Sequence, residues 1–183
     1  MFSFDDGGTA PTGGNVILRI IGAISTICGW FAALLIVLSV AVTCEMIFVR
    51  GVLNQSTIWQ TEAVVYMMIA ATLLGLPYVQ RLRGHVNVDL LPMLLPPGPR
   101  KALIVLTLVA AVVVIALVLY YGIHQWYEAW SRNWRSDTVW GVRLWIPYLA
   151  IPVGFGLYLL QLVADLYAVI VGIDRNYGIS EHN

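Results

Sequence analysis

Three carboxylates lie at the edges of long apolar segments, and their type and position could support ion or proton chemistry. Glu45 ends the first segment, Glu62 lies one turn inside the second, and Asp165 lies near the end of the fourth. An ionisable side chain at membrane depth is costly and commonly marks an ion or proton pathway. All three lie close to a membrane surface, where water and headgroups lower that cost.

A proton or ion relay would need further polar groups along the same path. No apolar segment supplies such a chain through its middle. We therefore favour structural ion pairs over a relay. The expected partners are Arg50 for Glu62 or Glu45, and Arg19 or Arg81 for Asp165.

Motifs for catalysis and cofactor binding are missing from the sequence. It contains no CxxC, HExxH, GxSxG or glycine-rich phosphate loop. His85 and His124 are expected at opposite membrane faces, so they cannot hold one metal or haem. Cys28 and Cys44 would stand roughly 24 Å apart along one helix, beyond disulfide reach. We predict no enzyme activity, no cofactor, and no catalytic, substrate-binding or metal-binding residue.

The composition predicts a membrane protein. The chain has 183 residues, of which 60% are hydrophobic and 11% are charged, whereas a soluble domain averages about 25% charged. Its formal net charge of zero argues against a nucleic-acid partner. Residues 1–15 are rich in glycine and lack a basic start, so we expect a flexible tail rather than a signal peptide.

Four apolar runs predict an all-α integral membrane protein with four transmembrane helices. The charge-free residues 20–44 of the first run would span about 37 Å as a helix, more than the ~30 Å hydrocarbon core. Ser25, Gly29 and Ala33, spaced by four, suggest a stripe that another helix approaches closely. The expected spans are residues 16–49, 58–80, 102–122 and 144–172, followed by a C-terminal tail over 173–183.

The two connections after the second and third spans differ in character. Residues 84–99 alternate polar and apolar side chains and end in a proline-rich turn, which suggests a short interfacial element between helices 2 and 3. Trp126, Trp130 and Trp134 repeat every four residues, with Arg135 beside them. This repeat is typical either of an anchor at the membrane interface or of a docking surface for a soluble partner.

The distribution of basic residues predicts the orientation. Four spans place both termini on one side of the membrane, together with the second loop. A compact cluster of four basic residues lies in that loop: Arg81, Arg83, Arg100 and Lys101. Because cytoplasmic loops carry an excess of Lys and Arg, we expect both termini in the cytoplasm.

A pattern in and after the second span resembles a known family. It consists of a glutamate near the helix start, an aromatic residue four positions on, a Leu-Gly pair, and then a Gly-His-Val-Asn-Val-Asp-Leu-Leu run. These are Glu62, Tyr66, Leu74-Gly75 and residues 84–91, with further matches at 145–148 and 152–154. In these positions the chain resembles the small membrane subunit of tripartite ATP-independent periplasmic (TRAP) transporters. Val65 departs from the family, where many members carry arginine.

The resemblance implies a non-catalytic role in the bacterial inner membrane. In that family a periplasmic binding protein delivers an organic acid to a large membrane subunit, which moves it by an elevator motion, usually coupled to sodium. The small subunit is similar to a static scaffold, with the large subunit, the binding protein and membrane lipids as partners. Structural or interface candidates are Glu62, Tyr66, Arg81, Gly84, His85, Asp89 and Asp165. Docking candidates are Trp126, Trp130, Trp134 and Arg135.

Two other interpretations stay open. In one, the chain is a self-sufficient small exporter that works as a homo-oligomer, with Glu62 as a proton-coupled site. In the other, it is a structural or assembly membrane protein with no transporter partner. Co-isolation with a chain of ten or more apolar spans would favour the scaffold, and self-association alone would favour the exporter.

The orientation can be tested with a reporter fused after Asn183. A reporter that works only outside the cytoplasm should stay inactive there, because the basic second loop keeps that side of the protein in the cytoplasm. Activity of this reporter at the C-terminus would reverse the predicted orientation.

Overall fold

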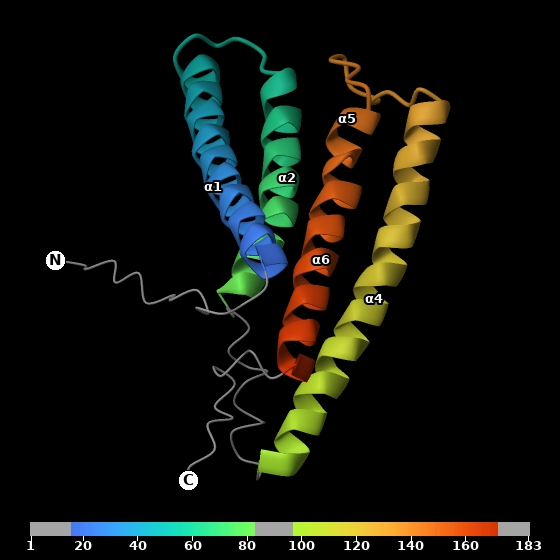
Figure 1. Cartoon of the computed structure of the whole chain (residues 1–183). Coiled ribbons are helices and arrows are strands. Elements are labelled where there is room, and N and C mark those ends of the chain that lie inside the picture. Colours follow the sequence, from blue (N-terminus) through green and yellow to red (C-terminus); the bar gives the residue numbers. More distant parts are fainter. Residues whose placement is uncertain (1–15, 83–96, 172–183) are drawn as a thin grey trace, which may run out of the picture.

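The computed structural model describes residues 16–82 and 97–171, and these residues are helical over most of their length (Figure 1). The helices are α1 Val16–Gly51, α2 Trp59–Arg81, α4 Pro97–Ser131, α5 Trp145–Tyr148 and α6 Ala150–Val171. Within these described residues, four stretches are long and apolar enough to cross a membrane: Leu18–Gly51, Trp59–Arg81, Ala102–Ser131 and Trp145–Val171, the last combining α5 and α6. The prediction of an all-α protein with four membrane helices is therefore confirmed.

The third membrane helix differs from its predicted bounds. It begins at Pro97, within the stretch expected to form a turn, and continues to Ser131 rather than ending near residue 122. Proline fits the first turn of a helix, where its missing N–H costs little. The rest of the predicted interfacial element, including Gly84, His85 and Asp89, lies outside the described residues, as do both tails.

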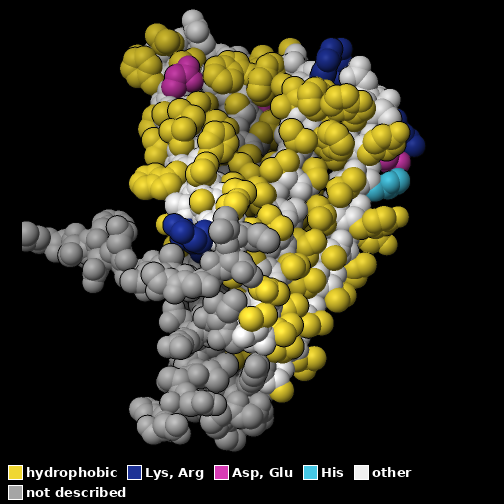
Figure 2. All heavy atoms as spheres, in the orientation of Figure 1, with side chains coloured by type: hydrophobic (Ala, Val, Ile, Leu, Met, Phe, Trp, Pro, Cys, Tyr) yellow, Lys and Arg dark blue, Asp and Glu magenta, His cyan; other side chains and the backbone are white. Residues whose placement is uncertain are grey.

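The four membrane helices stand in a row rather than in a closed square. Figure 1 shows the order α1, α2, α6, α4, with α2 packed between α1 and α6. The helix α4 reaches the rest of the protein mainly through α6, and the lower end of α1 also leans on α6. A row leaves much of each outer helix uncovered, so apolar side chains dominate the visible surface (Figure 2).

The inward face of α1 follows a seven-residue repeat. Over residues 18–51 of α1, the buried residues are Ser25, Ala32 and Ser39, which follow one another at intervals of seven. Residues spaced alternately by three and four stay on one face of a helix, whereas residues spaced only by four are displaced by about 40° around the helix at each interval. The predicted stripe therefore holds at Ser25 and at Gly29, which lies against the Tyr78 ring, but is wrong at the exposed Ala33.

Close packing contacts also join α6 to its two neighbours, α4 and α2. Between α4 and α6, an apolar cluster is centred on Ile104, Leu108, Leu162 and Val169. Between α2 and α6, the backbones meet at Gly154, where an added Cβ would lie 2.9 Å from the Leu73 carbonyl oxygen. Membrane helices use small residues at such points, because close backbone approach strengthens van der Waals packing.

We predict that Gly154→Ala destabilises the protein by about 1–3 kcal/mol, because the new methyl group has no room against the α2 backbone. The matched control is Gly156→Ala in the same helix, since a Cβ there meets nothing within 4 Å. Both changes gain the same helix propensity, so the difference in thermal unfolding temperature between them isolates the packing cost. Equal unfolding temperatures would contradict the close contact.

Candidate functional site

The carboxylate of Glu62, in the first turn of α2, lies at the centre of a cluster of hydroxyl groups. Tyr66, one turn further along the same helix, donates to Glu62 Oε1 at 3.0 Å. The other donors come from the connection between α4 and α5. There Thr138 donates to Oε2 at 2.7 Å, and Ser136 donates to Oε1. Glu62 thus ties this connection to α2.

These partners differ from the predicted ones. Among residues 16–82 and 97–171, the described ion pairs are those of Glu128 with His124 and with Arg132. Neither Glu62 nor Glu45 therefore forms the predicted ion pair with Arg50. Hydroxyl groups donate charge-assisted hydrogen bonds to a carboxylate, which satisfies both oxygens without a cation. The Ser136 and Thr138 contacts were missed because nothing in the local sequence marks hydroxyl residues that fold back across more than 70 positions.

The connection that Glu62 holds is a short hairpin, residues 132–144. The Ser136 amide donates to the Val142 carbonyl at 2.8 Å, and the Leu144 amide donates to the Trp134 carbonyl at 2.9 Å. Gly141, with φ +60°, closes the turn by donating to the Thr138 carbonyl at 3.0 Å. The hairpin therefore has internal backbone pairing as well as its side-chain attachment to α2.

Aromatic rings pack at the base of the hairpin. The Trp126 and Trp130 rings lie 5.6 Å apart on α4, and Trp130 meets Trp145 edge-on at 4.8 Å. Trp126 Nε1 donates to the Trp145 carbonyl at 3.1 Å, which joins the end of α4 to the start of α5. Trp134 lies three residues beyond Ser131, the last residue of α4, and belongs to the hairpin, so the predicted stripe continues on the helix only as far as Trp130.

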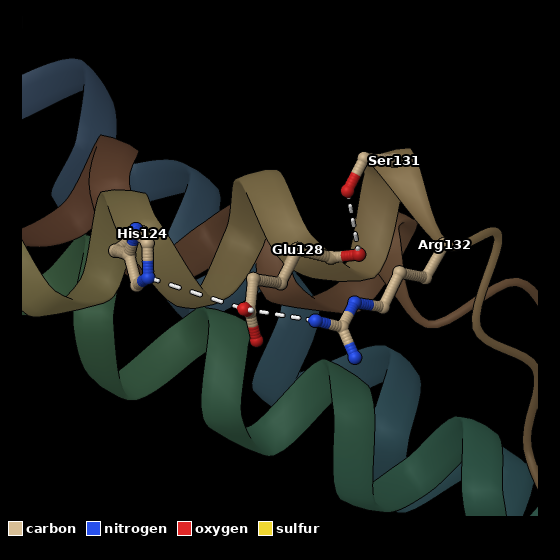
Figure 3. A network of polar contacts seen from close by, with 4 residues as sticks. All are labelled: His124, Glu128, Ser131 and Arg132. Atoms are coloured by element: carbon tan, nitrogen blue, oxygen red, sulfur yellow. Dashed lines mark hydrogen bonds and ion pairs between the residues drawn. The ribbon is translucent and has the colours of Figure 1, made fainter.

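The hairpin and the end of α4 expose basic and aromatic side chains together. Arg132, Arg135 and Arg143 are exposed, Trp130 is 54% exposed, and Val139 at the tip is 86% exposed. Along α4, Glu128 pairs with Arg132 at 3.6 Å and lies 4.0 Å from His124, while Ser131 bonds to the Glu128 carbonyl (Figure 3). Such exposed ion pairs add little stability, so Arg132 and His124 can exchange them for contacts with a partner protein.

A second polar network joins three helices near the opposite end of the protein. Ser25 of α1 donates to Gln161 Oε1 at 2.8 Å, and Gln161 Nε2 donates to Asp165 Oδ1 at 2.9 Å within α6. Gln80 of α2 donates to Asp165 Oδ2 at 3.0 Å. Ser25 and Gln161 are only 2% and 6% exposed. This network sets α1, α2 and α6 in register.

The arginine expected beside Asp165 has other contacts. Arg81 donates through Nη1 to the Gly22 carbonyl at 2.8 Å and to the Thr26 hydroxyl, both on α1. Asp165 instead accepts from the two glutamine amides. Gln161 precedes Asp165 by four residues in an apolar helix, and this spacing was the signal that could have found the pair. Over the described part of the chain, no group of three or more His, Cys, Asp or Glu could hold a metal ion.

Fold and site together define a small multi-pass membrane protein whose described polar clusters join its own helices and loop. Residues 39–172 match the family described as tripartite ATP-independent periplasmic transporters, DctQ component. The match covers most of the chain, so the protein belongs to this family. The resemblance read from Glu62, Tyr66 and the residues after them is confirmed.

Two relatives carry names that agree with the family. The chain is 25% identical over 140 residues to the ectoine TRAP transporter small permease protein TeaB of Halomonas elongata, covering 74% of this chain and 72% of the relative. It is 24% identical over 156 residues to the C4-dicarboxylate TRAP transporter small permease protein DctQ of Vibrio cholerae, covering 73% and 67%. Both relatives are named as small permease subunits.

Removing the Glu62 carboxylate should loosen the hairpin. In Glu62→Ala the Ser136 and Thr138 hydroxyls lose their acceptor, and about 1–3 kcal/mol of hydrogen bonding is lost. We expect trypsin to cleave after Arg135 and Arg143 about 5–150 times faster, since cleavage follows local opening. The control is Glu45→Ala, which removes an exposed carboxylate from α1. Equal cleavage rates in the two variants would contradict the role of Glu62.

Proposed function

We propose that this chain is the static scaffold of a TRAP transporter in the bacterial inner membrane, with both termini in the cytoplasm. Its partner is the large membrane subunit, which performs the elevator motion. Family membership and the names of the two relatives support the assignment to a small permease subunit. A moving transport subunit needs an immobile neighbour, and a row of long apolar helices can widen the anchored part of the complex.

The observation that carries this proposal is that polar side chains of the helices form their hydrogen bonds within the protein itself. Glu62 is bonded to a loop, and Asp165 is bonded to two glutamines. Hydroxyls in the middle of the helices, such as those of Ser39, Thr72 and Thr107, donate to carbonyls of their own helix. Groups that are bonded within the protein form a support rather than a path for cargo.

The cargo that we propose for the whole complex is an organic acid, taken up with sodium as the coupling ion. The name of one relative refers to C4-dicarboxylates, which belong to this class, and the name of the other refers to ectoine. Recognition of the solute would belong to the other subunits. This chain would contribute neither a solute ligand nor a coupling site.

We propose the hairpin and the neighbouring end of α4 as the docking surface for the periplasmic binding protein. Trp130 and the exposed arginines combine the residue types that are enriched at binding hot spots. Because Glu62 and the backbone pairing hold the hairpin in one shape, docking would lose little conformational entropy. Three arginines against Asp137 in residues 132–143 favour a partner with an acidic surface.

The scaffold role can be tested by reconstitution. Liposomes with the large subunit, this chain and the binding protein should accumulate the solute on a sodium gradient, whereas liposomes with this chain alone should not. Solute movement by the chain alone would support the exporter instead, with Glu62 as the residue to test next. Full transport by the large subunit and binding protein without this chain would also overturn the scaffold.

Docking can be tested by the double substitution Trp130→Ala with Arg135→Ala. Loss of two hot-spot side chains should raise the Kd of the binding protein for the membrane complex at least tenfold. The control is Arg50→Ala, an exposed arginine at the same end of the protein but on α1. Surface plasmon resonance on the complex in nanodiscs measures both. An unchanged Kd for the double variant would remove the hairpin as the docking surface.

A further inference from the structure

Two arginines lie on neighbouring turns where Arg81 of α2 packs on the first part of α1. Arg19 lies in the first turn of α1, and Arg81 is the last residue of α2. Arg81 reaches across to α1, where its Nη1 donates to the Gly22 carbonyl and the Thr26 hydroxyl. Figure 2 shows dark blue basic side chains in this region of the surface.

The contact with α1 fixes the Arg81 guanidinium but does not use all of its donors. The group lies against Gly22, where an added Cβ would be 3.3 Å from Nε and 3.8 Å from Nη2. A guanidinium carries five N–H donors, and Nη1 holds only two of them. The side chain stays exposed, so the donors on Nε and Nη2 form an oriented fork of the kind that binds phosphate in a bidentate manner.

Arg19 adds a second positive charge beside this fork. It precedes Gly22 by three residues, so both lie on one face of α1, a single turn apart. The Arg19 side chain is exposed. Within residues 16–82 and 97–171, the arginine that forms an ion pair with a carboxylate is Arg132, on α4. The charges of Arg19 and Arg81 are therefore not balanced by a described carboxylate.

Both arginines lie at the ends of charge-free stretches that are long enough to cross the hydrocarbon core. The charge-free stretch of α1 begins directly after Arg19, and that of α2, residues 63–80, ends directly before Arg81. The α2 stretch is about 27 Å long as a helix, close to the ~30 Å thickness of the hydrocarbon core. A charge at the end of such a stretch sits among the headgroups, where basic residues attract anionic lipids.

We propose that Arg19 and Arg81 form a binding site for the headgroup of an anionic phospholipid. The Arg81 fork holds the phosphodiester, and Arg19 contributes the second charge. Thr26 and the Gly22 carbonyl hold Arg81 in place as positioning groups. Because the site lies across the junction of α1 and α2, the bound lipid stabilises the packing of these two helices.

Native mass spectrometry and thermal unfolding of the delipidated full chain in detergent test this site, with phosphatidylglycerol as the probe. We expect wild-type protein to retain one tightly held phosphatidylglycerol and to unfold at a higher temperature when it is added. Arg19→Gln should weaken retention about fivefold, as expected for one basic residue near the surface. Arg81→Lys should also weaken it, since lysine keeps the charge but lacks the fork. The control is Arg50→Gln, which removes an arginine from the other end of α1.

Three results would overturn the proposal. The first is that Arg19→Gln retains as much phosphatidylglycerol as Arg50→Gln. This comparison does not depend on folding, because Arg19 is exposed and makes no described contact whose loss would unfold the protein. An equal rise in unfolding temperature with inorganic phosphate would identify the ligand as free phosphate rather than a lipid. Unchanged lipid retention, combined with weaker co-purification of the large subunit, would assign the two arginines to a carboxylate of that partner.

Discussion

The hydrocarbon core offers no water to polar groups, and the arrangement of α1, α2 and α6 follows from this constraint. Gln161 accepts from Ser25 and donates to Asp165, whose second oxygen accepts from Gln80. The bonds from Ser25 and Gln80 require α1 and α2 to present these side chains at set heights along α6, while the bond between Gln161 and Asp165 links the two acceptors within α6. Apolar packing alone would allow the helices to slide, whereas a network of four side chains accepts only one register.

The same constraint acts at the opposite end, but there it organises a loop. Glu62 lies in the first turn of α2, where hydroxyl donors reach it from residues 136 and 138, outside the candidate spans. The result is a hairpin tied to α2 rather than one that moves with α4 and α5 alone. Helix α4, by contrast, is held through apolar contact with α6 and aromatic contact at the base of the hairpin. The two ends of the protein therefore differ in how they are fixed.

Much of this architecture was predictable from the sequence, because the length and apolarity of a membrane helix are local properties. The four spans followed from them, and the family followed from Glu62, Tyr66 and the motif beyond. The partners of Glu62 were not predictable, since they depend on how a distant loop folds back. The inward face of α1 was predicted only in part. A spacing of four and an alternating spacing of four and three agree over the first turn, and they diverge in the second, where Ala32 rather than Ala33 is buried. The continuation of α4 to Ser131 was not predicted, because a change in side-chain polarity near residue 122 does not by itself end a helix.

The bond between Ser25 and Gln161 joins residues 136 positions apart. During synthesis, α1 and α2 enter the bilayer long before α6 leaves the ribosome, so the Ser25 hydroxyl can only turn to its own helix carbonyl at Ile21 until then. Gln80 likewise cannot donate to Asp165 until α6 has been inserted. The first helical pair is thus inserted in an unfinished state, and arrival of the last helix completes it. A chain that stops before α6 therefore lacks the Asp165 carboxylate to which Gln80 donates, and this network cannot set its α1 and α2 in register.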